Sequence, residues 1–402
     1  SINFKELANK YQTPYYVYDF DHITKQYEEL KGAFRARKSL IAYAVKANSN
    51  LSVIKHLANL GAGADCVSIG EVKRALKVGI PPYKIIFSGV GKIDEEIKQA
   101  LELDILMINV ESDAELNRVE LIAKELGKTA RISIRVNPNI DPQTHPYIST
   151  GLHENKFGVD IESAKRMYIH AKNSASLDPV GIHFHIGSQI TEVEPFKEAA
   201  LVLANLLRNL KALKIDIKFF DVGGGIGIQY KDETTVALYE YAQSIFAALT
   251  GLDVTLVCEP GRYLVGDCGY FLTKVLYEKH NGYKRFVIVD GAMNDLIRPS
   301  LYHAYHAIEV EGKVTTQETT LCDVVGPICE SGDFFAKNIE LPALEHDDLL
   351  VIKSAGAYGF TMSSNYNTRS RVAEVALENG NDRLIRRREN FDDVIALEKE
   401  YL

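Results

Sequence analysis

The residues best suited to chemistry each follow a short apolar run of the chain. Lys46 ends the run LIAYAVK, and the stretch DVGGGIG begins at Asp221. A lysine after an apolar run is often a surface residue, but it can also form a Schiff base, because its amine pKa falls when it is buried beside other cations. The glycines at 223–225 can present backbone N–H groups to a phosphate. The lysine and the loop together predict a phosphorylated aldehyde cofactor.

Glu259, in CEPGR, adds an electronic argument to this prediction. A carboxylate beside a pyridine nitrogen keeps that nitrogen protonated, so the ring becomes a strong electron sink. Loss of CO2 from an α-amino acid requires such a sink, whereas a cation at this place would favour racemisation. The alternative role for Glu259 is a salt bridge to Arg262, three residues further on.

His183 and His185, in VGIHFHI, offer a competing interpretation. Side chains two residues apart in a strand point to the same face, so this pair could bind zinc for metal-dependent hydrolysis. Zinc sites draw further ligands from other strands, and no other histidine follows a predicted strand. The sequence therefore favours a different role, in which His185 stacks on a flat aromatic cofactor.

These residues need a fold that brings the ends of many strands together. Between residues 40 and 260 short β-rich runs alternate with segments of helical spacing, which predicts an α/β protein with a (β/α)8 barrel. Catalytic groups in such a barrel sit at the C-terminal ends of the strands. A doubly wound sheet is the competing fold, but its glycine-rich turn would follow the first strand and here it follows the seventh. Eight strands are expected, at residues 40–45, 64–67, 85–88, 105–108, 131–136, 180–186, 217–222 and 255–259.

The pattern changes after the barrel, which is expected to span residues 23–265. Runs such as KRFVIVD and DLLVIKSAG alternate without long helices between them. This pattern predicts a β-rich domain, a sandwich or Greek key, over residues 266–402. The strand-like segment TPYYVYDF, within residues 1–22, could pair with that domain.

Composition excludes several classes of protein. The chain has 402 residues, a net charge of −8 and five cysteines. The negative charge argues against a nucleic-acid partner, and five cysteines without a CxxC pair indicate reduced thiols rather than disulfides or a zinc site. We see no signal peptide and no apolar run of the about 20 residues that cross a bilayer. We therefore expect a cytoplasmic protein that binds no membrane and no metal.

The motifs YAVKAN, GADCVSIGE, HFHIGS, DVGGGIG, EPGR, RPSLY, CESGD and AGAYG occur in this order along nearly the whole chain. Together they resemble the fold-type-III pyridoxal-phosphate decarboxylases, and most closely the branch that acts on diaminopimelate. The resemblance implies an alanine-racemase-like barrel joined to a β-domain, with pyridoxal 5′-phosphate as the cofactor. One departure is VDGAMNDLIRP, where the family more often has Asp-Ala-Gly, and it affects only the expected loop geometry.

The resemblance also implies roles for individual residues. Lys46 would hold the cofactor, and Asp65 would position the lysine. His185 would stack on the cofactor ring and act in catalysis, while Glu259 would contact the ring nitrogen. Further cofactor-binding residues are expected at Arg135, Ser188, Gly223, Gly224, Gly225, Gly261, Arg262 and Tyr358, of which Arg262 and Tyr358 would also reach the substrate.

The substrate needs its own argument, because the family also contains decarboxylases of ornithine, arginine and carboxynorspermidine. meso-Diaminopimelate carries a second ammonium group and a second carboxylate at its distal end. Arg298, in NDLIRPSLY, is the natural bidentate partner for that carboxylate, and Glu330, in CESGD, can pair with the ammonium group. An ornithine enzyme would instead bury an arginine without a partner. Tyr302 is expected to help Arg298 hold the distal end.

A homodimer with shared active sites is also implied, because the resemblance assigns Cys329 and Glu330 to the partner subunit's site. Cys329 would return a proton after CO2 leaves, and its alternative role is a packed interface thiol. The predicted reaction converts meso-diaminopimelate, at its D-configured centre, to L-lysine and CO2. A non-catalytic cofactor-binding homologue is the remaining alternative, although it would be expected to lack the β-domain and the CESGD segment.

Overall fold

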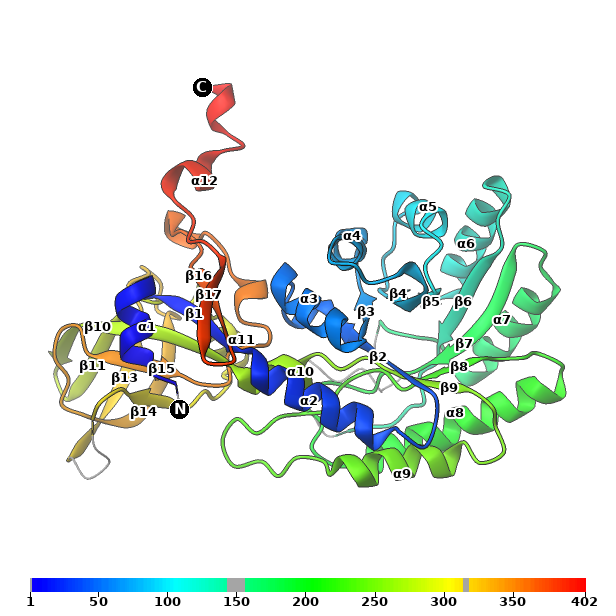
Figure 1. The fold of residues 1–402 in the computed structure, drawn as a ribbon, viewed down its shortest axis with the longest axis horizontal. Coiled ribbons are helices and arrows are strands. Elements are labelled where there is room, and N and C mark those ends of the chain that lie inside the picture. Colours follow the sequence, from blue (N-terminus) through cyan, green and yellow to red (C-terminus); the bar gives the residue numbers. More distant parts are fainter. Residues whose placement is uncertain (1, 143–155, 314–317) are drawn as a thin grey trace. The chain divides into compact units, whose positions relative to one another are not determined.

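The computed structural model describes residues 2–142, 156–313 and 318–402 (Figure 1). The chain divides into two compact units, which we call the barrel unit and the sheet unit. The barrel unit comprises Thr24–Ile228 and Thr234–Leu264. The sheet unit comprises Ser1–Ile23, Gln229–Glu233 and Val265–Leu402.

In the described residues of the barrel unit, eight parallel strands form a closed barrel, which confirms the predicted (β/α)8 fold (Figure 1). Each strand pairs with its neighbours in chain order, and β2 pairs with β9 to close the barrel. The strands are β2 (Ser39–Ala44), β3 (Gly63–Cys66), β4 (Ile85–Phe87), β5 (Met107–Val110), β6 (Ala130–Arg135), β7 (Leu177–His183), β8 (Phe219–Asp221) and β9 (Thr255–Cys258).

Helices alternate with these strands, and their ends follow from the local sequence. The side chains of Asn50, Ser68 and Ser112 accept backbone N–H groups at the starts of α3, α4 and α6, and Gly61 ends α3 in the left-handed conformation. The helices are α2 (Phe20–Ala33), α3 (Leu51–Leu60), α4 (Ile69–Lys77), α5 (Asp94–Glu102), α6 (Asp113–Glu125), α7 (Ile161–Asn173), α8 (Glu194–Ala212), α9 (Leu238–Ala248) and α10 (Arg262–Val265).

Two strand ends differ from the prediction in ways that affect the site. β2 ends at Ala44, and Lys46 lies in the following one-turn 3₁₀ helix, Val45–Ala47. β7 ends at His183, where its pairing with β8 also ends. The prediction that His183 and His185 lie in one strand is therefore wrong, because the chain leaves the sheet between them.

Apolar side chains from several barrel strands pack into one buried cluster. The periodic apolar residues of the strands supply it, and complete burial of one such side chain contributes about 1.5–3 kcal/mol. The cluster comprises Ala42, Ile86, Leu106, Met107, Val180 and Val257. This core holds the strands in register and therefore fixes where their carboxyl ends lie.

In its described residues, the sheet unit contains a nine-stranded sheet with the order β14-β13-β11-β10-β1-β16-β17, and β15 pairs with β10 and β12. The N-terminal strand β1 pairs antiparallel with β10 and parallel with β16. The strands are β1 (Tyr15–Asp19), β10 (Gly269–Asn281), β11 (Lys284–Val289), β12 (Ile308–Val310), β13 (Thr319–Val325), β14 (Phe334–Pro342), β15 (Leu349–Ile352), β16 (Ala373–Glu378) and β17 (Asn381–Arg386). Its helices are α1 (Phe4–Tyr11), α11 (Arg298–Tyr302) and α12 (Phe391–Ile395).

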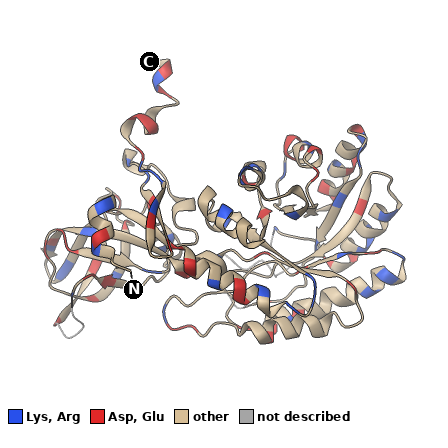
Figure 2. Ribbon diagram, viewed as in Figure 1, with Lys and Arg blue, Asp and Glu red and all other residues tan. Residues whose placement is uncertain are grey.

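The surface of the described residues has a mixed charge. Figure 2 shows basic and acidic positions interspersed along the helices that surround the barrel. All five cysteines are free, and of these only Cys329 is exposed. Within the described part of the chain, no helix combines the length and the apolar character needed to cross a membrane.

Candidate active site

The carboxyl ends of the barrel strands carry most of the residues that the sequence singled out. Lys46 follows β2, Asp65 lies within β3, Gly223 follows β8 by two residues, and Glu259 directly follows β9. Asp65 is paired in register with Ala44, two residues before the lysine. Parallel pairing around the closed barrel brings these ends to one rim, where barrel enzymes place their chemistry.

Lys46 is exposed, while its neighbours Val45 and Ala47 are buried. The sequence led us to expect a buried amine, and the structure corrects this point. The reason is local: Lys46 lies in the one-turn 3₁₀ helix Val45–Ala47 that follows β2. Burial and the nearby Glu259 raise the pKa of Asp65 well above its ordinary value, and the positive charge of Lys46 opposes that shift. The amine is therefore both accessible and electrostatically coupled to Asp65.

A chain of buried hydrogen bonds links Asp65 to Glu259 across three neighbouring strands. Ser88 Oγ donates to Asp65 Oδ1 over 2.7 Å, and Asn109 Nδ2 donates to Ser88 Oγ over 3.0 Å. The same amide nitrogen lies 3.4 Å from Glu259 Oε2. Asn109, a polar residue within the apolar run of β5, was not among the predicted site residues. Its isolation in that run was the available signal, since buried polar groups are usually hydrogen-bonded.

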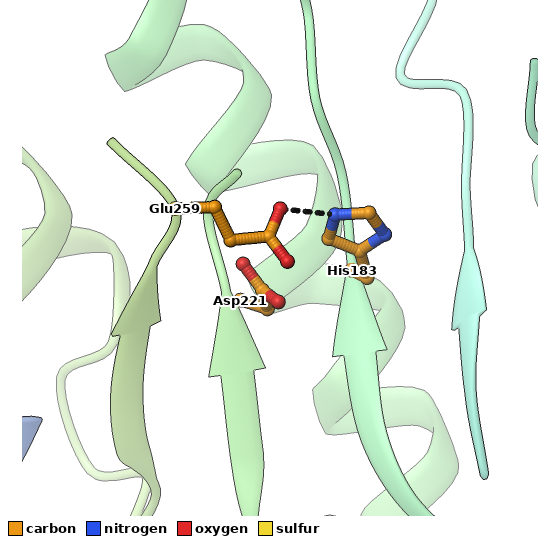
Figure 3. Close-up of side chains that lie close together, drawn as sticks. All are labelled: His183, Asp221 and Glu259. Carbon is orange, nitrogen blue, oxygen red and sulfur yellow. Dashed lines mark hydrogen bonds and ion pairs between the residues drawn. The ribbon is translucent and has the colours of Figure 1, made fainter. Parts of the chain in front are cut away.

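Glu259 also contacts His183 and Asp221, and all three side chains are buried (Figure 3). Glu259 Oε1 lies 2.9 Å from His183 Nε2, which must carry the proton because an ionised carboxylate only accepts. Asp221 Oδ1 accepts the N–H of Gly223 over 2.9 Å. The three side chains thus form one interior polar group beneath the rim.

The two carboxyl groups of this cluster titrate in opposite directions. Burial raises the pKa of Glu259, but His183 and then Asp221 lower it further than burial raises it, to about 2. Burial, followed by the charge of Glu259, raises the pKa of Asp221 well above its ordinary value. At neutral pH Glu259 is therefore an ionised carboxylate, and the raised pKa of Asp221 favours its protonated form, which can donate to Glu259.

The same three residues have the composition of a metal site, since their nearest ligand atoms all lie within 4.8 Å of one another. The chemistry of the group argues against that use. The Nε2–H of His183 donates to Glu259, and a protonated Asp221 is a poor ligand. His185 is not part of this group, and its Nδ1 instead accepts the N–H of Gly224. We interpret the cluster as a hydrogen-bonded support for Glu259.

His185 lies at the rim with its orientation fixed by two contacts. Its Nδ1 accepts the N–H of Gly224 over 3.1 Å, and its carbonyl oxygen accepts from Arg135 Nη2 over 3.3 Å. Burial, then Arg135 and Lys46, lower the pKa of His185 well below its ordinary value. Arg135 is itself paired with Glu111 over 3.1 Å. A neutral, half-buried ring with a fixed orientation is suited to stacking on a flat cofactor.

Two backbone N–H groups of the glycine loop, which the sequence had assigned to a phosphate, form hydrogen bonds within the protein. The N–H groups of Gly223 and Gly224 donate to Asp221 and His185, so they are not available to a phosphate. Among the described residues, no group accepts the N–H of Gly225 or Ile226. A Cβ on Gly224 would lie 2.3 Å from the carbonyl oxygen of Glu259, which explains the need for glycine. Of this loop, the N–H groups of Gly225 and Ile226 therefore remain for a phosphate.

Three further predicted residues lie beside this loop and the lysine turn. Arg262 Nη2 donates to Ser188 Oγ over 2.8 Å. A Cβ on Gly261 would lie 3.0 Å from the Cβ of Ala47, so this glycine permits close packing against the turn that carries Lys46. An arginine and a serine hydroxyl are suitable partners for a phosphate.

The remaining predicted residues belong to the sheet unit. Arg298 is buried at the start of α11, and its guanidinium lies 6.0 Å from the ring centre of Tyr302. Cys329 and Glu330 are exposed in the turn between β13 and β14. Tyr358 is half-buried and adopts a left-handed backbone conformation, with φ of 57°.

The rim residues of the barrel unit fit a cofactor that has an aldehyde, a phosphate and an aromatic nitrogen. The accessible amine of Lys46 suits the aldehyde. The N–H groups of Gly225 and Ile226, together with Arg262, suit the phosphate. The ionised carboxylate of Glu259, held by His183, suits a protonated ring nitrogen.

Comparison with known proteins agrees with this chemistry. Residues 20–266 match the family model described as pyridoxal-dependent decarboxylase, pyridoxal binding domain. The diaminopimelate decarboxylase of Campylobacter jejuni is 63% identical over 402 residues, which cover 100% of both chains. The enzyme of the same name from Helicobacter pylori is 57% identical over 401 residues, which cover 100% of this chain and 99% of the relative.

Solved structures show the same similarity. The crystal structure of Helicobacter pylori diaminopimelate decarboxylase complexed with L-lysine has a TM-score of 0.96 at 57% identity, covering 100% of both chains. The M. jannaschii diaminopimelate decarboxylase has a TM-score of 0.92 at 39% identity, covering 98% of this chain and 93% of that chain.

Proposed function

Because this chain belongs to the pyridoxal-dependent decarboxylases, and within them to the diaminopimelate decarboxylase family, we propose a role for each residue of its site. The chain is a pyridoxal-phosphate-dependent lyase that makes lysine from meso-diaminopimelate. When bound, pyridoxal phosphate supplies an aldehyde that combines with the substrate amine and a ring that accepts the electrons of the bond to CO2.

The observation that carries this assignment is the buried pairing of Glu259 with His183. A carboxylate whose pKa is about 2 stays ionised at neutral pH and keeps a ring nitrogen beside it protonated. His183 donates to Oε1 and Asn109 to Oε2, so both oxygens of the carboxylate are held in place. A ring nitrogen that stays protonated favours loss of CO2 over racemisation.

The residues around Glu259 then take the remaining cofactor roles. Lys46 attaches the cofactor, and Asp65 helps to position the lysine. The neutral ring of His185 stacks on the cofactor and acts in catalysis. The phosphate is bound by the second half of the glycine loop, through the N–H groups of Gly225 and Ile226, with further contributions from Ser188, Gly261, Arg262 and Tyr358. Arg135 supports His185 through its backbone contact.

Substrate selection is assigned to the sheet unit. Arg298 holds the distal carboxylate, aided by Tyr302, and Arg262 and Tyr358 also contact the substrate. Glu330 pairs with the distal ammonium group. CO2 leaves from the D-configured centre, so the L-centre keeps its carboxylate in the product. Cys329 returns a proton to the carbon that has lost CO2.

We propose that the catalytic form is a cytoplasmic homodimer, in which Cys329 and Glu330 serve the partner subunit's site. Both residues are exposed in this chain, as residues that reach a partner must be. Five free cysteines and a biosynthetic reaction support the cytoplasm. We also propose that residues 23–265 act as the cofactor-binding domain and residues 266–402, with strand residues from 1–22, as the β-domain.

A CO2-release assay with meso-diaminopimelate, ornithine, arginine and carboxynorspermidine tests the substrate assignment. Only meso-diaminopimelate should be turned over efficiently. Lys46→Ala should abolish both turnover and the visible absorbance of the lysine-bound cofactor, while Lys55→Ala, an exposed lysine of α3, should retain both. Undiminished turnover by Lys46→Ala would refute the assignment of the lysine.

Arg298→Ala tests whether Arg298 binds the distal carboxylate of meso-diaminopimelate. The variant should raise the KM for meso-diaminopimelate far more than it changes any slight activity on lysine or ornithine. Equal effects on all three substrates would show that Arg298 does not contact the distal carboxylate.

A further inference from the structure

A buried histidine of the sheet unit contacts the arginine that is proposed to bind the distal carboxylate. Arg298 Nε lies 3.3 Å from His306 Nε2, and His306 Nδ1 lies 2.9 Å from the carbonyl oxygen of Lys353. The exposed fractions of Arg298 and His306 are only 8% and 2%. His306 was not among the predicted site residues.

These two contacts determine the proton arrangement of the imidazole. A carbonyl oxygen only accepts, so Nδ1 of His306 must carry the proton that points to Lys353. The guanidinium Nε–H of Arg298 only donates, so Nε2 of His306 must present a lone pair. The ring is therefore neutral and in a single tautomer. Its Nδ1 donates to the carbonyl oxygen of Lys353, the residue that follows β15, and its Nε2 accepts from Arg298.

Aromatic contacts fix the plane of the same guanidinium. The ring of Tyr230 lies 4.9 Å from the guanidinium carbon, and the ring of Tyr302 lies 6.0 Å from it. His306 packs edge-on against Tyr230, with ring centres 5.4 Å apart at 83°. Stacking on a tyrosine face leaves rotation within the plane undetermined, and the hydrogen bond to His306 removes that freedom.

The position of this hydrogen bond has a consequence for recognition. A guanidinium can hold a carboxylate bidentately either through Nε and one Nη or through its two Nη atoms. With Nε directed to His306, only the edge formed by the two Nη atoms can serve a carboxylate in this way. The histidine thus selects the edge, and with it the direction from which a carboxylate is held.

We propose that His306 is a positioning residue that orients Arg298 toward the distal carboxylate and so contributes to the choice of substrate. This inference rests on the proposed role of Arg298. Packing alone does not explain why a histidine occupies position 306. A phenylalanine or leucine here would leave the Nε–H of Arg298 and the carbonyl of Lys353 without this partner, whereas glutamine offers one donor and one acceptor at a similar spacing.

His306→Phe, which keeps the ring volume beside Tyr230, and His306→Gln, which keeps a donor and an acceptor, form a matched pair of holoenzyme variants. His306→Phe should raise the KM for meso-diaminopimelate about tenfold or more, since a hydrogen bond to a charged group is lost, and should lower kcat by a smaller factor. His306→Gln should have a KM close to that of the unaltered enzyme, because its amide keeps a donor and an acceptor. If His306→Phe does not fold, His306→Leu replaces it.

Ligand binding separates orientation of Arg298 from general damage to the site. L-Lysine keeps the carboxylate of the L-centre, and 1,5-diaminopentane has the same two amines without a carboxylate. Calorimetry on the holoenzyme should show that His306→Phe weakens the binding of L-lysine by about the factor by which it raises the KM. The affinity for 1,5-diaminopentane should stay unchanged. Equal weakening of both ligands, or no difference between His306→Phe and His306→Gln, would overturn the proposal.

Arg298→Ala distinguishes failure of this inference from failure of the function on which it rests. If Arg298→Ala leaves the KM unchanged, the role of Arg298 itself is refuted. If Arg298→Ala raises the KM but His306→Phe does not, only the positioning role is refuted. In the double variant His306→Phe should add little to Arg298→Ala, because residues that act through one contact are not additive. A fully additive effect would contradict the inference.

Discussion

His183 and Glu259 form an ion-pair-type contact of 2.9 Å in the barrel interior, where the side chains are only 3% and 5% exposed. The chain contains a second Glu–His contact of similar length, His170 with Glu120 at 2.8 Å, in which the side chains are 51% and 26% exposed. The two pairs have the same chemistry in opposite surroundings. This contrast provides a matched control for the role of Glu259.

Glu259→Gln should lower kcat for meso-diaminopimelate by about 100-fold or more, in the range found when a group that stabilises charge in the transition state is removed. An amide of the same size cannot balance a protonated ring nitrogen. Cofactor absorbance should confirm that the variant still binds pyridoxal phosphate. Glu120→Gln should stay within about twofold of the unaltered enzyme, and a similar loss in both variants would contradict the assignment.

Asp221→Asn should change how stability depends on pH. Burial and Glu259 raise the pKa of Asp221 in the folded chain, so above its ordinary value of 3.8 the folded state keeps a proton that the unfolded state releases. The folded state therefore loses stability as pH rises, by up to about 1.4 kcal/mol per pH unit, until the pH passes the folded-state pKa. Asparagine has no such proton, so this dependence disappears in the variant.

Unfolding midpoints measured from pH 5 to pH 9 check this prediction. The stability of Asp221→Asn relative to the unaltered enzyme should increase with pH until the pH passes the folded-state pKa of Asp221. Asparagine should also preserve activity, because its amide donates toward Glu259 and its oxygen accepts the N–H of Gly223, as protonated Asp221 does. A difference in stability that is the same at every pH would show that Asp221 is ionised in the folded chain.

Gly224→Ala should weaken cofactor binding and destabilise the barrel by about 1–3 kcal/mol, the usual cost of overpacking. The added Cβ would lie 2.3 Å from the carbonyl oxygen of Glu259, so the loop or the end of β9 must shift. Gly32→Ala is the control, because nothing lies within 4 Å of the Cβ it adds in α2. That variant should be neutral or slightly more stable. Titration with pyridoxal phosphate and thermal unfolding measure both effects.

Mixing inactive variants tests the shared active site. Lys46→Ala and Glu330→Ala should each be nearly inactive alone, because each homodimer lacks one essential group in both sites. Random mixed dimers should recover about one quarter of the activity, since half of the dimers are mixed and each has one intact site. No recovery after subunit exchange, verified by mass spectrometry of the dimers, would show that Glu330 serves its own subunit.

Much of the rim could be predicted from the sequence. Lys46, Asp65 and Glu259 all lie at the ends of runs whose spacing predicted a barrel, and barrel strands present such ends together. The rule depends only on the order of strands and helices, which apolar periodicity reveals. Periodicity locates the ends of strands less closely, so several boundaries were displaced by one to three residues: β2 ends at Ala44 rather than at residue 45, and β7 ends at His183 rather than at residue 186.

Chain order and residue type were therefore sufficient for the fold class, the cofactor and the substrate class. Only the tertiary structure showed that Asn109 and Asp221 support Glu259, that Gly223 and Gly224 use their N–H groups within the protein, and that His306 holds Arg298. The contacts of Gly223 with Asp221 and of Arg298 with His306 are near in sequence, whereas those of Asn109 with Glu259 and of Gly224 with His185 join parts of the barrel that are 150 and 39 residues apart. Their geometry depends on how side chains from separate strands converge, and neither periodicity nor local spacing contains that information.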